Sequence, residues 1–243
     1  MSKFRVLDLF SCIGFHAAGF ERAGGFETVA FCENNEFRRS ELSRRFPEVP
    51  IYDDVRTLPA IRADVIFGGP PCQETSVAAA IHDKRSGSSL WPYMLCAGID
   101  AEAEWVVVEQ PTGNQAWETS VHRHLSRAGY HSARFEFGLS DLGGPYPRRR
   151  VYILACASLS RLEIAWQAGP SAIESVKRAA VARGDWHPDT VPAFGMDTWR
   201  SESVSERRER IEALGDSNPP HMAEVIGRMI QATRPTGGSD DRD

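Results

Sequence analysis

The chain has 243 residues, of which 42% are hydrophobic and 25% are charged. This is the composition of an ordinary globular protein, and the length suits one well-packed core with a small appendage. The net charge of −5 at pH 7 argues against a protein that coats nucleic acid without regard to sequence, because such proteins are normally basic overall.

Neither a membrane span nor a signal peptide is indicated. No apolar run approaches the roughly 18 residues that a membrane crossing needs. The first ten residues, MSKFRVLDLF, contain a short apolar stretch that Asp8 interrupts, and they lack a small-residue cleavage site. The five cysteines are scattered and form no CxxC pair, so we expect no disulfide framework, no bound metal and a reducing cytoplasm.

The first 156 residues alternate between strand-like and helix-like patterns. Compact runs rich in Val, Ile, Leu and Phe predict strands at 4–10, 27–33, 63–69, 104–110, 130–138 and 150–156. Helical spacing and helix-ending Gly or Pro predict helices at 15–25, 36–46 and 112–129. Buried strands separated by helices imply βαβ units, so the predicted fold class is α/β, a Rossmann-like, doubly wound and mostly parallel sheet.

The pattern changes after residue 156. Ser171 and Glu174 form a capping box that predicts a helix over 171–183, and residues 184–199 are rich in Gly, Pro and Trp without any period. We therefore expect a main domain at 1–156, a small irregular module at 157–205, C-terminal helices at 206–234 and a disordered tail at 235–243.

The stretch VLDLFSCIG, residues 6–14, is typical of a strand that runs into a turn of small residues and then a helix. In doubly wound folds such a turn binds the cofactor, because backbone N–H groups and the helix N-terminus face it. We expect Asp8 and the loop from Phe10 to Gly14 to line this pocket. Cys12 and Phe15 stand where a glycine-rich loop has glycines, so a purely structural turn is an equally good interpretation.

Acidic residues follow the next two extended segments. Glu33 ends the predicted strand at 27–33, where a carboxylate accepts hydrogen bonds from a ribose diol in nucleoside-binding folds. The alternative is a surface acid at a strand end. It is less favoured because Asp53 and Asp54 follow another short segment in the corresponding place, where Asp54 suits adenine N6.

Cys72 lies in the sequence IFGGPPCQETS, directly after a predicted buried strand. The two prolines fix φ and remove N–H donors, so the loop before the cysteine is rigid. Open α/β sheets bind ligands outside the carboxyl ends of their strands, which is where Cys72 falls. A free thiol has a pKa of about 8.5, so a reactive cysteine needs electropositive surroundings.

Two further strand ends bring charge to the same rim. Glu109 follows an apolar strand and is placed to act as a proton donor. Arg148 and Arg150 open another strand, and because alternate residues share a face they can point into one cleft while Arg149 points away. Taken singly, Glu109 could be a capped strand end, the arginines could form a salt bridge, and Cys72 could be a buried thiol. Their combination predicts a catalytic site.

These residues resemble the DNA cytosine-5 methyltransferases, enzymes that use S-adenosylmethionine on a Rossmann-like sheet. VLDLFSCIGFHAAGFERAG is similar to the cofactor loop of that family, FCENN to its ribose-binding acid, and DDV to its adenine-binding aspartate. GGPPCQETS matches the nucleophile loop, EQP stands in place of Glu-Asn-Val, and GGPYPRRRVYIL stands in place of a turn followed by Arg-x-Arg. ALGDSNPPHMAEVIGRMI resembles the C-terminal segment that closes the cofactor pocket.

The resemblance implies a role for each of these positions. The implied catalytic residues are Cys72, Glu109, Arg148 and Arg150. The residues implied to bind S-adenosylmethionine are Asp8, Phe10, Ser11, Cys12, Gly14, Phe15, Glu33, Asn34, Asp54, Val55, Gly69, Pro71, Asp216 and Ser217. Gln73, Thr75 and Ser76 are implied to contact the DNA substrate.

The implied reaction is methylation of a cytosine that has flipped out of the duplex. Attack of the Cys72 thiolate on C6, with Glu109 hydrogen-bonding or protonating N3, makes an enamine whose C5 can accept the sulfonium methyl. A base then removes the C5 proton and Cys72 leaves. In this scheme Arg150 holds the cytosine O2 and Arg148 positions Glu109.

Three residues depart from the pattern of the family. Gln110 replaces the asparagine after the glutamate, and we expect it to loosen the loop that holds the base. Tyr146 replaces the usual glutamine before the arginines. Asp216 replaces an asparagine near the cofactor, where an extra carboxylate would weaken S-adenosylmethionine binding or alter the accepted analogue.

The target recognition domain of the family follows the arginine strand, and only residues 157–205 are available for it here. So small a module makes few contacts with base edges, so we expect a short target site or recognition shared with a partner. We expect a monomer that acts on double-stranded DNA in the cytoplasm of a bacterial or phage-infected cell, away from membranes, with a cognate restriction endonuclease as a further partner. A tRNA cytosine-5 methyltransferase and a catalytically inactive regulator that binds nucleic acid stay open as alternatives.

Overall fold

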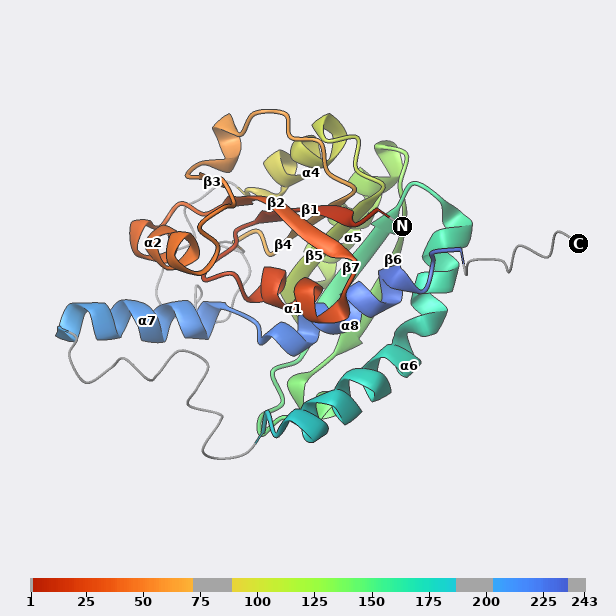
Figure 1. Ribbon diagram of the computed structural model, residues 1–243. Helices are drawn as coiled ribbons and strands as arrows, with labels where there is room; N and C mark the ends of the chain where they lie inside the picture. The colour runs from red at the N-terminus through yellow and green to blue at the C-terminus, as the bar shows by residue number, and fades with distance from the viewer. Residues whose placement is uncertain (1, 72–88, 187–202, 236–243) are drawn as a thin grey trace, which may run out of the picture.

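The computed structural model describes residues 2–71, 89–186 and 203–235. These residues form one seven-stranded sheet in the order β3-β2-β1-β4-β5-β7-β6, with helices on both faces (Figure 1). The strands are β1 (Phe4–Leu9), β2 (Phe26–Cys32), β3 (Ile51–Tyr52), β4 (Val65–Gly68), β5 (Trp105–Pro111), β6 (His131–Phe137) and β7 (Arg150–Cys156). The α-helices are α1 (Phe15–Ala23), α2 (Glu36–Arg45), α4 (Trp91–Asp100), α5 (Gln115–Arg127), α6 (Leu159–Arg183), α7 (Val204–Asp216) and α8 (Pro220–Gln231), and the 3₁₀ turns are η1 (Val55–Thr57) and η2 (Leu139–Leu142).

The sheet is mostly parallel. Strands β3, β2, β1, β4 and β5 run in one direction, and β7 pairs antiparallel with both β5 and β6. The strand order reverses between β1 and β4, and in open α/β sheets ligands bind outside the carboxyl ends of the strands at that point. The predicted α/β fold with a doubly wound, mostly parallel sheet is confirmed.

The two faces of the sheet carry separate apolar cores. Along β5, Trp105 and Val107 pack in the core formed with α1, α6 and α8, whereas Val106 and Val108 pack in the core formed with α4 and α5. This alternation follows from the two-residue period of a strand, and it explains why the strand is apolar without interruption. Helices α1, α6 and α8 therefore cover one face, and α4 and α5 cover the other (Figure 1).

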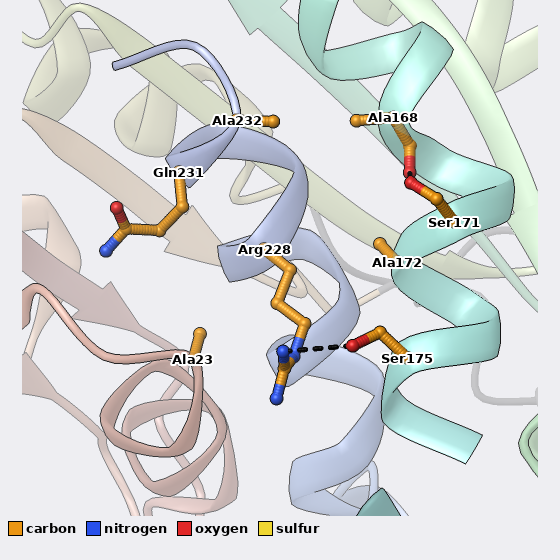
Figure 2. Close-up of a pocket in the computed structure, with 8 residues that line it drawn as sticks. All are labelled: Ala23, Ala168, Ser171, Ala172, Ser175, Arg228, Gln231 and Ala232. Atoms are coloured by element: carbon orange, nitrogen blue, oxygen red, sulfur yellow. Dashed lines mark hydrogen bonds between the residues drawn. The ribbon is translucent and has the colours of Figure 1, made fainter. Parts of the chain in front are cut away.

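Helices α1 and α8 approach each other closely. A Cβ atom at Gly19 would lie 2.3 Å from the carbonyl oxygen of Pro220, and one at Gly227 would lie 2.6 Å from the Cβ of Ala23. Small residues at the contact allow this approach, and they bring the start of α8 next to α1. On its other side α8 faces α6, where Arg228 donates to the Ser175 hydroxyl at 3.2 Å across a shallow cleft (Figure 2).

Helix α6 differs from its prediction. It begins at Leu159 rather than at residue 171, and Ser158 is its N-cap, accepting from the Arg161 N–H. Ser171 lies inside the helix and donates to the Ala168 carbonyl, so the capping box at Ser171 is wrong. Pro170 is tolerated within the helix because one face is buried on the sheet throughout, through Leu162, Ala165, Gly169, Ala172, Val176 and Ala180.

The part of 157–205 that the structure describes is thus mainly a helix packed on the sheet. Most of the irregular stretch at 184–199 and the predicted tail at 235–243 lie outside the described residues. Helix α7 confirms the expectation that the chain becomes helical again near residue 206. None of the helices in the described part of the chain combines the length and apolar character of a membrane crossing.

Candidate active site

The carboxylate of Glu109 lies where the ends of β4 and β5 meet the start of β7. Its Oε1 atom is 2.9 Å from Nε of Arg150, and the contact is an ion pair rather than an aligned hydrogen bond. Its Oε2 atom lies against Gly69, where a Cβ atom would be only 2.6 Å away. Both Glu109 and Arg150 are largely shielded from solvent, with side chains 10% and 18% exposed. The acid is therefore fixed between a guanidinium and the first residue after β4.

Gln110 ties the loop after β4 to strand β5. Its side-chain amide is buried and donates a hydrogen bond to the carbonyl of Pro70 at 2.7 Å. The Gln110 side chain thus holds the backbone two residues before Cys72, and the expectation that it loosens the loop that holds the base stays a prediction. The nucleophile and the predicted DNA contacts, Cys72, Gln73, Thr75 and Ser76, lie outside the described residues.

The three consecutive arginines have three different partners. Arg149 points away from the site and pairs with Glu136 and Asp141 on the surface, as predicted. The backbone of Arg148 has a positive φ of 29°, and this turns its side chain toward the segment before α8. Its guanidinium donates to Asn218 Oδ1 at 3.0 Å and to the carbonyls of Gly215 at 2.8 Å and Ser217 at 2.5 Å.

The prediction that Arg148 positions Glu109 is therefore wrong, whereas the role of Arg150 at the cytosine O2 stays a prediction. Arg150, not Arg148, is the residue in contact with Glu109. Arg148 instead fixes the C-terminal segment, although its charge still acts on the same buried region. Tyr146, the other departure in this stretch, is 50% exposed.

The predicted cofactor turn follows β1. Phe10, Cys12 and Gly14 all have positive φ, so the backbone winds tightly before α1 begins at Phe15. Ser11 closes the turn by donating to the Asp8 carbonyl at 2.6 Å. At Gly14 a Cβ atom would lie 2.5 Å from the ring of Phe46, so the close approach as well as the φ of 82° requires glycine.

Glu33 connects this turn to the next strand. One oxygen of its buried carboxylate accepts from the Cys12 N–H at 2.8 Å, and the other accepts from the Asn35 N–H at 2.9 Å. Asn35 in turn caps α2 by accepting from the N–H of Arg38. Asn34 is exposed beside them. A carboxylate has about four lone-pair sites, so Glu33 retains capacity for hydroxyl donors.

The C-terminal segment covers the turn from the other side. The Cys12 thiol donates to the Ala213 carbonyl at 3.3 Å, and burial raises the pKa of this thiol to about 11. Asp216 pairs with Arg38 of α2 at 2.5 Å, and Ser217 is buried next to it. The extra carboxylate at 216 is thus compensated by a cation from another helix.

Two other predicted residues have contacts of their own. Asp8 is fully buried beneath α1, and its carboxylate faces His16 at 3.4 Å. Asp54 caps η1, where Val55 is buried, and its two oxygens bind the side chain of Arg56 at 2.8–3.0 Å. Hydrogen bonds from Arg56 lower the pKa of Asp54. An adenine amino group would have to share this carboxylate with Arg56.

Most of the predicted site residues that the structure describes follow the carboxyl ends of the parallel strands or lie at the start of β7, whereas Asp216 and Ser217 come from the C-terminal segment. The cleft in Figure 2 lies elsewhere, at the far end of α1 and α8, where Ala23 and Ala232 line it. Asn218, Arg38 and His16 were not predicted to take part. His16 alone had a local signal, since it is a polar residue on the otherwise apolar face of a predicted helix.

Residues 4–179 match the family profile described as C-5 cytosine-specific DNA methylase. The chain belongs to this family. A type II methyltransferase of Bacillus subtilis, M2.BsuMI, is 31% identical over 167 residues, covering 62% of this chain and 41% of that protein. M.AplI, a type II methyltransferase of Arthrospira platensis, is 24% identical over 220 residues, covering 85% of this chain and 63% of that protein.

Solved structures show the same fold. A mutant of Spodoptera frugiperda DNMT2 superposes with a TM-score of 0.54 at 22% identity, covering 65% of this chain and 51% of DNMT2. The Schizosaccharomyces pombe Dnmt2 methyltransferase gives a TM-score of 0.51 at 18% identity, with 63% and 51% covered. The chain spans between 41% and 63% of the length of the curated relatives named above.

Proposed function

We propose that the chain transfers a methyl group from S-adenosylmethionine to C5 of a cytosine flipped out of DNA, through a transient bond between Cys72 and C6. The observation that carries this proposal is the position of Glu109. Its carboxyl is held against Arg150 and Gly69, at the base of the loop that leads to Cys72. An acid fixed beside a cysteine loop is the arrangement needed to activate a pyrimidine ring.

The residues of the chain would divide the work as follows. The Cys72 sulfur adds to C6 while the Glu109 carboxyl donates a proton or hydrogen bond to N3, so the electron pair of the C5–C6 double bond becomes available at C5. After C5 has been methylated, a base removes its proton and the sulfur leaves, which restores the double bond. Arg150 keeps Glu109 in place, and its remaining donors suit the cytosine O2.

The cofactor turn fits S-adenosylmethionine. The tight backbone at Phe10, Cys12 and Gly14, and the spare acceptor capacity of Glu33, suit a ligand with a ribose diol. We propose Asp54 and Val55 as contacts for the adenine, and Asp216 and Ser217 as the residues that cover the turn. When bound, this cofactor supplies an electrophilic sulfonium methyl. Asp8, Phe15, Asn34, Gly69 and Pro71 stay predictions as cofactor contacts.

DNA is the substrate that the relatives favour, because M2.BsuMI and M.AplI are both named type II methyltransferases. We propose double-stranded DNA as the substrate. Helix α6 occupies most of the first part of the 157–205 segment, so we propose that residues 184–205 recognise the DNA. The monomeric state, the cytoplasmic location and a partner endonuclease are proposed on the same basis.

The test is to incubate the purified protein with labelled S-adenosylmethionine and either mixed-sequence duplex DNA or tRNA, and to locate 5-methylcytosine by bisulfite sequencing. We expect label in the DNA. Cys72→Ser should abolish transfer, whereas Cys96→Ser, at an exposed cysteine on α4, should retain it. Persistent transfer by Cys72→Ser would refute the nucleophile assignment. Label in tRNA alone, or DNA binding without transfer by the unaltered protein, would favour one of the other two functions.

A further inference from the structure

The side chain of Arg56 occupies the carboxylate that the proposed function assigns to the adenine. Its Nε atom lies 2.9 Å from Oδ1 and 3.0 Å from Oδ2 of Asp54, and its Nη2 atom lies 2.8 Å from Oδ2. The backbone N–H of Arg56 also donates to Oδ1, at 2.9 Å. A residue two positions along the chain therefore makes all four of these contacts with Asp54.

Four contacts saturate a carboxylate. Its two oxygens have about four lone-pair sites in all, and each oxygen of Asp54 accepts two of the bonds from Arg56. The fork formed by Nε and Nη2 is the bidentate geometry in which arginine binds carboxylates best. A further donor can therefore bind Asp54 only if the Arg56 guanidinium gives up a contact.

The sheet places this pair next to the acid proposed for the ribose. Tyr52 of β3 is level with Cys32 of β2, and the Tyr52 carbonyl accepts from the N–H of Glu33 at 2.9 Å. Glu33 and Asp54 thus follow the carboxyl ends of two neighbouring parallel strands, one and two residues after the paired positions. The base of a nucleoside bound to Glu33 through its ribose would lie toward Asp54.

The two acids differ in how firmly their oxygens are occupied. Glu33 accepts from two backbone N–H groups, one on each oxygen, and retains free lone pairs. Asp54 is saturated mainly by a side chain, and that side chain is 60% exposed while its own is 30% exposed. A guanidinium so exposed moves into solvent at little cost. The hold of Arg56 on Asp54 is therefore a reversible one that a ligand has to displace.

We propose that Arg56 is a specificity-determining residue at the adenine end of the cofactor site: by saturating Asp54 it weakens the recognition of the adenine amino group. This inference rests on the proposed function, in which Asp54 contacts adenine N6. A free carboxylate would reject a purine with a carbonyl at C6, because two acceptors would face each other. A carboxylate covered by a guanidinium rejects it less, and the guanidinium can itself donate to that carbonyl.

The test compares two nucleosides that differ only at this position. Isothermal titration calorimetry gives the Kd of S-adenosylhomocysteine, which lacks the transferred methyl, and of S-inosylhomocysteine, in which hypoxanthine replaces adenine. Arg56→Met keeps the backbone N–H and the length of the side chain but removes the guanidinium. We expect it to bind S-adenosylhomocysteine about fivefold more tightly, the factor that corresponds to about one net hydrogen bond. Its preference for adenine over hypoxanthine should rise about tenfold.

The matched control is Arg62→Met. The side chain of Arg62 pairs with Glu102 and is 61% exposed, almost the same as Arg56, and this variant should leave both Kd values unchanged. The double variant of Arg56→Met and Asp54→Asn removes the carboxylate as well, so the tighter binding should disappear. If Arg56→Met binds S-adenosylhomocysteine no more tightly than the unaltered protein, or if the gain survives in the double variant, the proposal is overturned.

A second measurement follows the guanidinium itself. The Nε–H signal of Arg56 is recorded by NMR at low temperature and assigned by its absence from Arg56→Met. Saturation with S-adenosylhomocysteine should shift this signal and leave that of Arg62 in place, because only Arg56 has to release a carboxylate. An unmoved Arg56 signal at saturation would contradict the displacement.

The outcomes separate this inference from the proposed function. Methylated DNA together with an unaltered base preference in Arg56→Met would overturn the role of Arg56 alone. The expected changes in Kd without any label in DNA would refute methyl transfer to DNA and leave the role of Arg56 intact. Absence of binding by every variant would refute both.

Discussion

Replacing Gln110 by Met tests the link between β5 and the loop that leads to Cys72. Met has nearly the length and volume of Gln but lacks its amide donor, so the buried carbonyl of Pro70 loses the hydrogen bond that it accepts at 2.7 Å. Leaving a buried acceptor unsatisfied costs about 1–3 kcal/mol. We expect the free energy of unfolding, measured by urea denaturation, to fall by about that amount.

The same change should slow the chemistry more than it weakens binding. Cys72 follows Pro70 by two residues, and a misplacement of about 1 Å in a reacting group can cost about 100-fold in rate. In single-turnover assays with saturating cofactor and DNA, we expect the rate to fall by about 10- to 100-fold. Gln115→Met, on the exposed start of α5, is the control and should change stability by no more than about 0.5 kcal/mol. A Gln110→Met protein with unaltered stability and rate would show that this hydrogen bond does not hold the loop.

Three further outcomes follow from the packing and the charges. Gly19→Ala should lower the free energy of unfolding by about 1–3 kcal/mol in urea denaturation, because its Cβ would collide with the Pro220 carbonyl. Arg148→Ala should raise the KM for S-adenosylmethionine about tenfold with a smaller change in kcat, because it releases the segment over the cofactor turn. With the thiol pKa of Cys12 raised to about 11, only about one in a thousand of these thiols is ionised at pH 8, so iodoacetamide should label the exposed Cys96 long before Cys12 in peptide mapping.

Each of these has its own control. Gly215→Ala adds a Cβ that meets nothing within 4 Å, so it should not destabilise the protein. Arg149→Ala removes only surface ion pairs and should leave the cofactor KM unchanged. Cys32, whose thiol pKa is raised by burial to about 12, should be as slow to alkylate as Cys12. Rapid labelling of Cys12 in the folded protein would contradict the burial described for it.

The sheet and the rim of the site could be predicted because their signals are local. A run such as VVVEQ shows a buried strand and the acid at its end within a few residues, and GGPPC shows a rigid turn. Helix α6 shows the limit of this approach. Gly169 and Pro170 predict a break in the helix. Burial of Leu162 and Ala165 before this point, and of Val176 after it, outweighs that local preference.

The partners of the arginines could not be predicted for a different reason. Alternation along a strand holds only inside the strand, and Arg148 lies before β7 with a positive φ, so it leaves the face that Arg150 occupies. Its partners are 67 to 70 residues away in the sequence, and no short pattern records them. Helix α4 was not predicted from the sequence, although Trp91, Met94 and Gly98 are at helical spacing. The apolar run around them fits a segment without helical periodicity equally well.

The position of α8 has a consequence for how the protein comes to be folded. Ten of its twelve residues are buried, and it fills the space between α1, near the start of the chain, and α6. A chain that ends before residue 220 would expose the apolar sides of both helices at once, so premature termination should yield aggregates rather than a smaller working enzyme. During synthesis the apolar side of α1 stays uncovered until α8 has been made. A chaperone that shields α1 in that interval would raise the yield of active protein.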